Sequence, residues 1–198
     1  MPKVSDAHLA ARRRQILDAA ARCFARDGFH RTSMQDIVRE SGISAGLVYR
    51  YFAGKDDMIA AIVTEWHDQR RALLGGSPGE QVAAYLAYLR SVGDPAAAET
   101  LRLGVQVWAE SLRSPRLHDL ARRNVDDPRA DTAAAIRHLQ AAGALDPGLD
   151  PDALARILIA VYQGLVLQTA WDETVDNEAY VRTAQTILEA LTPTARNE

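Results

Sequence analysis

Proline placement is the feature that most restricts the fold of this chain of 198 residues. Six of the eight prolines directly follow an aspartate or a serine. Because Asp and Ser favour the helix N-cap and Pro favours the first helical position, each such pair indicates a possible helix start. The pairs are Ser77-Pro78, Asp94-Pro95, Ser114-Pro115, Asp127-Pro128, Asp146-Pro147 and Asp150-Pro151. No segment alternates with the period of two that strands require, so we expect an all-α chain.

Nine helical segments follow from this punctuation together with the glycines near segment ends. The expected spans are 7–27, 33–41, 45–52, 55–74, 78–92, 95–113, 115–142, 151–171 and 177–191. Pro128 lies inside the seventh span. It is expected to kink or split that helix, because proline removes a backbone donor and clashes with the preceding turn.

Composition and motif content exclude several classes of protein. Hydrophobic residues make up 47% and charged residues 25% of the chain, which is typical of a soluble globular protein. The single cysteine, Cys23, excludes a disulfide scaffold, and its place on the apolar stripe of the first helix favours a core role. No apolar run reaches the roughly 18 residues that span a bilayer. The N-terminus lacks a signal-peptide core, so we expect a cytoplasmic protein without a membrane partner.

Enzyme chemistry finds little support in the sequence. The five histidines show no metal-ligand spacing. A nucleophile elbow, a Gly-rich phosphate loop and a Cys-x-x-Cys pair are all absent from the sequence. We therefore expect no enzyme activity, no metal and no cofactor.

Charge is distributed unevenly along the chain. Residues 1–60 contain ten Lys and Arg against seven Asp and Glu, whereas residues 61–198 contain thirteen against nineteen. The net charges of +3 and −6 add up to the −3 of the whole chain. Opposite signs in two parts suggest two tasks, and the basic part could face nucleic acid.

Residues 32–55 carry the most informative pattern. Thr32 is expected to cap the second helix, with Gln35 as its capping-box partner. Gly42 allows the left-handed turn that ends this helix, and Ser44 can cap the next one. Two short helices joined by a tight turn that contains glycine form a helix-turn-helix. The alternative is a plain helical hairpin that serves packing alone.

The third helix separates an inner face from an outer one. Val48 and Phe52 lie one turn apart and are expected to pack on the second helix. Leu47 and Arg50 lie opposite, where Arg can donate to guanine and Leu can touch a thymine methyl in a DNA major groove. Gly46 allows close approach of the backbone. The residues suited to phosphate oxygens are Ser44, Tyr49 and Lys55.

The segments Gly28-Phe29, Thr32 to Val38 and Ser41 to Met58 together resemble the DNA-binding signature of the TetR family of bacterial regulators. This resemblance implies a two-domain, nine-helix homodimer, a repressor that a small ligand releases from a palindromic operator. It implies a helix-turn-helix domain at 1–54 and a ligand-binding and dimerisation domain at 55–198.

The resemblance also assigns roles by position. Val48 and Tyr51 depart mildly from the family, which usually has Leu and most often His there. The phosphate-holding positions would be Thr32, Ser33, Tyr49, Tyr51 and Lys55, and the base-facing positions Ala45, Gly46, Leu47 and Arg50. Arg12, Arg13 and Arg14 match a basic arm that many members carry, although a solvated helix face explains them equally well.

The span 151–171 is apolar nearly all round, so it must be buried on two sides. One side of this helix can pack within its own chain. A chain of this size has little else to cover the other side, whereas a second copy of the chain can cover it. Together with the last helix it would form a four-helix dimer interface. The expected interface residues are Leu158, Val161, Leu165, Tyr180, Ala184, Ile187 and Leu188.

A ligand pocket is expected where aromatic walls meet a few polar groups. The candidates are Trp66, Tyr85, Tyr88, Gln106, Trp108, His138 and Gln163. The alternatives are core packing for Trp66 and Tyr85 and simple solvent exposure for Gln106 and His138. Three functions remain open from the sequence: a ligand-released repressor, an activator or ligand-independent regulator of the same fold, and a helical enzyme or scaffold.

Overall fold

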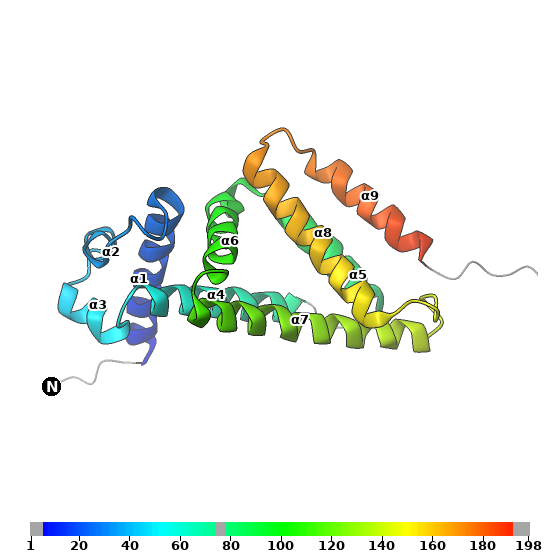
Figure 1. Ribbon diagram of the computed structural model, residues 1–198, viewed down its shortest axis with the longest axis horizontal. Helices are drawn as coiled ribbons and strands as arrows, with labels where there is room; N and C mark the ends of the chain where they lie inside the picture. The colour runs from blue at the N-terminus through cyan, green and yellow to red at the C-terminus, as the bar shows by residue number, and fades with distance from the viewer. Residues whose placement is uncertain (1–5, 74–77, 192–198) are drawn as a thin grey trace, which may run out of the picture. The chain divides into compact units, whose positions relative to one another are not determined.

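The computed structural model describes residues 6–73 and 78–191, and helices dominate these ranges (Figure 1). The α-helices are α1 (Asp6–Asp27), α2 (Met34–Ser41), α3 (Ala45–Tyr51), α4 (Lys55–Leu73), α5 (Pro78–Ser91), α6 (Ala98–Ser111), α7 (Pro115–Ala141), α8 (Pro151–Trp171) and α9 (Asn177–Ala190). The expected all-α class is confirmed. The sixth expected helix is divided, because a 3₁₀ turn, Pro95–Ala97, precedes α6.

Several Asp-Pro and Ser-Pro pairs begin helices as expected. The Asp150 carboxylate accepts from the backbone N–H groups of Asp152 at 2.8 Å and Ala153 at 3.1 Å, and so caps α8. Two pairs do not begin a helix: Asp146-Pro147 lies in the loop between α7 and α8, and Pro128 lies inside α7. Within the described residues α7 runs through it as one helix, so the expectation that the helix splits there is wrong. Proline removes one backbone donor, and the bonds on either side suffice to continue the helix.

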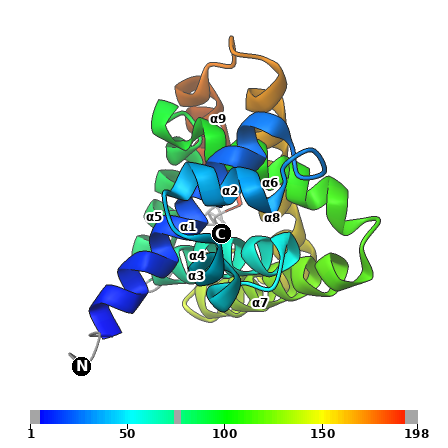
Figure 2. The ribbon, with the colours of Figure 1, turned by 90° about the vertical axis from the view of Figure 1, so that its left-hand side faces the viewer.

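The chain divides into two compact units. Residues 1–67 and 99–121 form one, here called the hairpin unit, and residues 68–98 and 122–198 form the other, here called the cavity unit. In the hairpin unit, α1 to α4 share one core with part of α6 and the start of α7. Its fully excluded side chains include Ile16, Phe24, Ile37, Val48, Met58 and Leu103. Figure 2 looks onto α2 and α3 of this unit.

The hairpin unit is also tied by polar contacts between distant segments. The Nε2 atom of His30 lies 2.7 Å from a Glu110 carboxylate oxygen, which joins the turn between α1 and α2 to α6. The Gln15 amide donates to the Ser41 carbonyl at 2.7 Å and so secures the C-terminal end of α2 on α1. These two contacts thus hold the α1–α2 turn against α6 and the end of α2 against α1.

The cavity unit contains α5, α8, α9 and the later part of α7. A small core gathers around Ala133 and Ile136 of α7 and Ala155 of α8. The Tyr180 hydroxyl of α9 donates to the Val161 carbonyl of α8 at 3.0 Å. At the start of α9, the Asn177 amide donates to the Arg90 carbonyl at the end of α5, at 3.1 Å. These bonds hold the helices that surround the cavity described below.

Candidate nucleic-acid interface and cavity

The start of α2 is a complete capping box, shifted by one residue from the expected one. The Ser33 hydroxyl oxygen accepts from the Asp36 N–H at 3.2 Å, and the Asp36 carboxylate accepts from the Ser33 N–H at 2.9 Å. The predicted Thr32–Gln35 box is wrong, because both Ser33 and Asp36 satisfy the motif in the next register. The Ser33 hydroxyl also donates to the carboxylate at 2.6 Å, and these bonds lower the pKa of Asp36.

The turn between α2 and α3 has the geometry of a helix-turn-helix. Gly42 has φ of 66°, a left-handed conformation that glycine adopts without steric cost. The Ser41 hydroxyl donates to the Val38 carbonyl at 3.0 Å and accepts from the Ile43 N–H at 3.2 Å. Ser44 precedes α3, and its exposed side chain makes no capping hydrogen bond there. The turn is thus fixed by Ser41 and Gly42.

The α3 helix presents one side to the core and the other to solvent. Val48 is fully buried and Phe52 nearly so, as expected. Leu47 and Tyr51 are half-buried and pack against the same core, and the Tyr51 hydroxyl donates to the Leu9 carbonyl at 3.3 Å. The exposed residues of α3 are Ala45, Gly46, Tyr49 and Arg50. The small residues Ala45 and Gly46 allow close approach of the backbone to a duplex, and Arg50 supplies a guanidinium that can reach base edges.

Four of the five expected phosphate-holding residues hydrogen-bond within the chain: Ser33 and Tyr51 as described above, and also Thr32 and Lys55. Thr32 is 2% exposed, and its hydroxyl donates to the carbonyls of Gly28 at 2.9 Å and Cys23 at 3.2 Å. The Lys55 ammonium donates to the carbonyls of Phe29 and Thr32, both at 2.7 Å, and lies 4.7 Å from the centre of the Phe29 ring. Both side chains close the turn between α1 and α2.

Basic residues of α1 are paired with a carboxylate of α4. Glu65 accepts from Arg13 at 2.7 Å and from Arg14 at 3.0 Å, and Arg12 donates to Gln15 at 2.9 Å. The Arg13 guanidinium also lies 5.5 Å from the centre of the Phe52 ring. These side chains are roughly half exposed, so the pairs bind α1 to α4 while leaving positive charge at the surface.

Cys23 lies in the core beneath this surface. Burial, and then the nearby Glu40 carboxylate, raise the pKa of its thiol, which favours the unreactive protonated form. Glu40 itself accepts from Arg22 at 2.9 Å and from Arg26 at 3.4 Å, and these bonds lower the pKa of its carboxyl.

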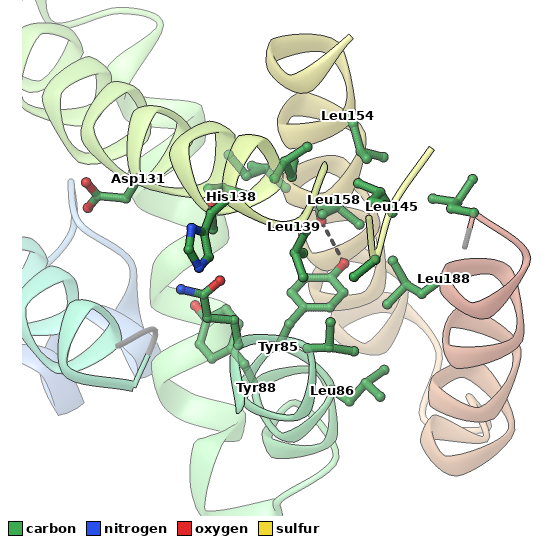
Figure 3. Close-up of a pocket in the computed structure, with 18 of the residues that line it drawn as sticks. Tyr85, Leu86, Tyr88, Asp131, His138, Leu139, Leu145, Leu154, Leu158 and Leu188 are labelled. Atoms are coloured by element: carbon green, nitrogen blue, oxygen red, sulfur yellow. Dashed lines mark hydrogen bonds between the residues drawn. The ribbon is translucent and has the colours of Figure 1, made fainter. Parts of the chain in front are cut away.

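The cavity unit contains a cavity of about 550 Å³, open to solvent on one side, between α5, α7, α8 and α9 (Figure 3). Of the expected ligand residues, Tyr85 and Tyr88 from α5 and His138 from α7 line it. Gln163 belongs to the same unit but is not part of the lining, and Trp66, Gln106 and Trp108 belong to the hairpin unit. The structure therefore brings three of the seven candidates together.

Sequence reasoning missed several polar residues of the cavity wall, namely Gln81, Asp131, Thr132, Tyr162, Gln185 and Glu189. Asp131 lies on the same face of α7 as His138, at a spacing of seven residues, and this spacing would have identified it. Tyr162 of α8 stacks on Tyr88 of α5, with ring centres 4.3 Å apart. Tyr162 belongs to the span 151–171, which the sequence describes only as apolar nearly all round, and its cross-helix partner leaves no signal in the sequence.

Six of the seven expected dimer residues, all but Leu165, line a second hollow of about 520 Å³ between α8, α9 and Tyr85. Ile187 is 59% exposed, whereas Leu165 is fully buried within its own chain. Ala184 is 8% exposed, and the remaining four are half-buried: Leu158, Val161, Tyr180 and Leu188. The neighbouring Ile157 and Trp171 of α8 are also well exposed.

Metal and membrane chemistry have little support. Over residues 6–73 and 78–191, no group of three His, Cys, Asp or Glu side chains is placed to hold a metal ion. Helix α8 has the length and apolar composition of a membrane span. One such helix is weak evidence, because a core helix of a soluble protein has the same properties.

Comparisons with known proteins agree with this geometry. Residues 16–62 match the family described as bacterial regulatory proteins, tetR family. Residues 78–193 match the C-terminal domain described as that of a BetI-type transcriptional repressor. An HTH-type transcriptional repressor of Mycobacterium tuberculosis is 46% identical over 65 residues, which cover 33% of this chain and 35% of that protein.

Solved structures extend the likeness to nearly the whole chain. Salmonella enterica GusR is 27% identical, with a TM-score of 0.78 over 96% of this chain and 98% of its own. A putative transcriptional regulator from Saccharomonospora viridis, in complex with choline, is 25% identical. Its TM-score is 0.76, over 91% of this chain and 96% of its own.

Proposed function

Because the chain belongs to the TetR family of bacterial regulatory proteins, we propose that it is a dimeric repressor of transcription, released from a palindromic operator by a small molecule. The family consists of transcriptional regulators and not of enzymes. The observation that carries the proposal is the outer face of α3, where Arg50 is exposed beside Gly46 while Val48 anchors the helix in the core.

Residues 1–54 would read DNA, and residues 55–198 would bind the effector and form the dimer. Arg50, Ala45, Gly46 and Leu47 would approach base edges in the major groove. The outward-facing hydroxyls of Ser44 and Tyr49 suit phosphates better than Thr32 and Lys55 do, because these two already bond to carbonyls of the protein. The protein would act in the cytoplasm, where its DNA lies, without a membrane partner.

The test is selection of a binding sequence from random DNA duplexes, followed by titration at several salt concentrations. A repressor of this kind is expected to select a palindrome whose half-sites lie one turn or more apart. Transcription in vitro from a promoter that carries the selected site then separates repression from activation. Recovery of no preferred sequence would contradict the proposal.

Dimerisation is proposed through α8 and α9. Support comes from the exposed Ile157 and Ile187, at 58% and 59%, which border the second hollow. A partner subunit that covers both removes apolar surface from water. Sedimentation is expected to give a dimer for the wild type and a folded monomer for Ile187→Asp. The control Leu112→Asp changes another exposed aliphatic residue, in the hairpin unit, and is expected to stay dimeric. A monomeric wild type would contradict the assignment.

Release by a small molecule is proposed from the cavity of about 550 Å³, within the usual range of roughly 300–1,000 Å³ for ligand sites. The choline complex of a similar regulator is consistent with such a role. A typical coupling of about 1–3 kcal/mol corresponds to roughly 5–150-fold weaker operator binding. Reciprocity requires that operator DNA weaken effector binding by the same factor.

A further inference from the structure

The walls of the cavity limit what can occupy it. Most of the lining is aliphatic and comes from all four surrounding helices. These side chains include Leu86, Ile136, Leu139, Leu154, Leu158 and Leu188. Such walls favour a ligand with an extended apolar body. The cavity volume of about 550 Å³ leaves room for a body much larger than choline.

Apart from His138, the ionisable side chains of the lining are two solvent-exposed carboxylates and tyrosines. Asp131 of α7 and Glu189 of α9 contribute carboxylates, whereas the described lining residues include no lysine and no arginine. A ligand anion that enters such a cavity loses its hydration and finds no cation to replace it, which is costly. A ligand cation finds two exposed carboxylates at the cavity, and both also interact within the chain: Glu189 accepts from the Gln185 amide at 2.8 Å, and Asp131 has a partner of its own. Negative charge at the cavity still favours a cation over an anion.

Three tyrosines add surface that suits a cation. Tyr88 and Tyr162 stack across α5 and α8, with ring planes 22° apart. The Tyr85 hydroxyl donates to the Leu158 carbonyl at 2.9 Å, shown by the dashed line in Figure 3, so its ring serves as wall. Burial, and then Tyr180, raise the pKa of Tyr85 and keep this hydroxyl protonated. Aromatic faces attract organic cations as well as apolar chains.

We propose that the cavity of the cavity unit takes an organic cation with a long apolar body and rejects organic acids of the same size. The cationic head would lie near Asp131 and the tyrosine pair, and the apolar body would lie along the leucines of α8 and α9. This inference rests on the proposed function, because it names the chemical class of the effector.

The test compares three probes with the same ten-carbon chain and different heads: decyltrimethylammonium, 1-decanol and decanoate. Calorimetric titration of the full-length protein, below the concentration at which the probes form micelles, gives each dissociation constant. The cation is expected to bind at least about tenfold more tightly than decanoate, with decanol between them. Equal or tighter binding of decanoate overturns the proposal, and so does binding of none of the three.

Charge-neutral variants test whether the carboxylates supply the preference. Asp131→Asn and Glu189→Gln are each expected to weaken decyltrimethylammonium up to about fivefold, the range for exposed charge pairs. Both variants leave decanol binding unchanged. Glu173→Gln removes the same charge at an exposed site outside the lining and is the matched control. An equal effect of Glu173→Gln, or no effect of the two lining variants, contradicts a local role for the carboxylates.

Operator release is measured separately, by fluorescence anisotropy of the selected duplex with each probe. If the cation binds preferentially but leaves the operator bound, the ligand class stands and release by this cavity fails. If decanoate both binds best and releases DNA, the proposed function stands and the ligand class is wrong.

Discussion

The two units of this protein use apolar residues in different ways. In the hairpin unit, large side chains such as Phe24, Ile37 and Met58 are fully excluded from solvent in one contiguous core. In the cavity unit, Leu158 and Leu188 are only half-buried, and both border the two hollows described above. The core of the hairpin unit is filled by its own side chains, whereas the cavity unit has two hollows with apolar walls.

This difference corresponds to two physical requirements. Reading a base sequence requires that α3 be held in one geometry, which a close-packed core provides. Responding to a ligand requires space and a conformation that the ligand can stabilise relative to another. Filling the hollows would stabilise the protein and is expected to remove its response.

The largest expected effect comes from equal truncations in the two units. Leu17→Ala removes a side chain that is 2% exposed and is expected to cost about 2–5 kcal/mol of unfolding free energy. Leu188→Ala acts where space already exists and is expected to cost about 1 kcal/mol, near the centre of the range for point mutants. Urea denaturation of both variants measures the contrast. Equal costs would mean that the cavity unit is packed as tightly as the hairpin unit.

Arg50→Ala tests the outer face of α3. Loss of a bidentate contact to a base is expected to cost about 1–3 kcal/mol of operator binding and to relax the preference at one base pair. Arg182→Ala removes the same charge from the exposed side of α9 and should leave the preference unchanged. Anisotropy titrations with the selected duplex and its single-base variants provide the measurement. Wild-type affinity of Arg50→Ala would place the reading face elsewhere.

Lys55→Met separates two roles of one ammonium. The bonds to Phe29 and Thr32 predict a loss of about 1.5–3 kcal/mol of stability, typical of hydrogen bonds to a charged group. They also predict an unchanged salt dependence of DNA binding. A phosphate contact would instead lower the slope of log K against log salt by roughly one. Titrations at four salt concentrations, with thermal unfolding in parallel, decide between them.

The smallest effect concerns the cap of α2. Ser33→Ala removes the capping hydroxyl and is expected to cost about 1 kcal/mol at neutral pH. Ser44→Ala is the control, because Ser44 makes no side-chain capping bond, and it is expected to cost less than about 0.5 kcal/mol. Equal costs in urea denaturation would remove the distinction between the two caps.

The cost of Ser33→Ala is also expected to depend on pH. The Ser33 bonds lower the pKa of Asp36, so their contribution is present above the ordinary Asp value of about 3.9 and is lost as pH falls through the lowered pKa. The stability difference between Ser33→Ala and the wild type therefore shrinks in acid. A difference that stays constant from neutral pH to pH 3 would contradict the assigned cause.

Local sequence signals predicted the helices well because caps and turns act over a few residues. Asp150-Pro151 and Gly42 mark helix ends where the structure has them. The same signals failed by one residue at Thr32-Ser33, since adjacent hydroxyls offer two registers and packing selects one. Thr32 turns inward to satisfy the carbonyls that end α1.

Relations between distant helices were less predictable. Tyr85, Tyr88 and His138 reach the same cavity because α5 and α7 pack together, which no local pattern encodes. The apolar sequence of α8 does not indicate which of its residues are buried within the same chain and which stay exposed. Leu165 proves buried within the chain, whereas Ile157 of the same helix is exposed.

The position of Lys55 in the sequence bears on the order in which the hairpin unit folds. Its ammonium reaches carbonyls of residues that lie 26 and 23 positions earlier in the chain. Closing so long a loop costs more entropy than forming a local turn, so this contact forms after the helices it joins. The turn between α1 and α2 is then expected to reach its final geometry only when α4 has begun. In hydrogen exchange, the amides of Thr32 and Met58 should therefore open together, as parts of one cooperative element.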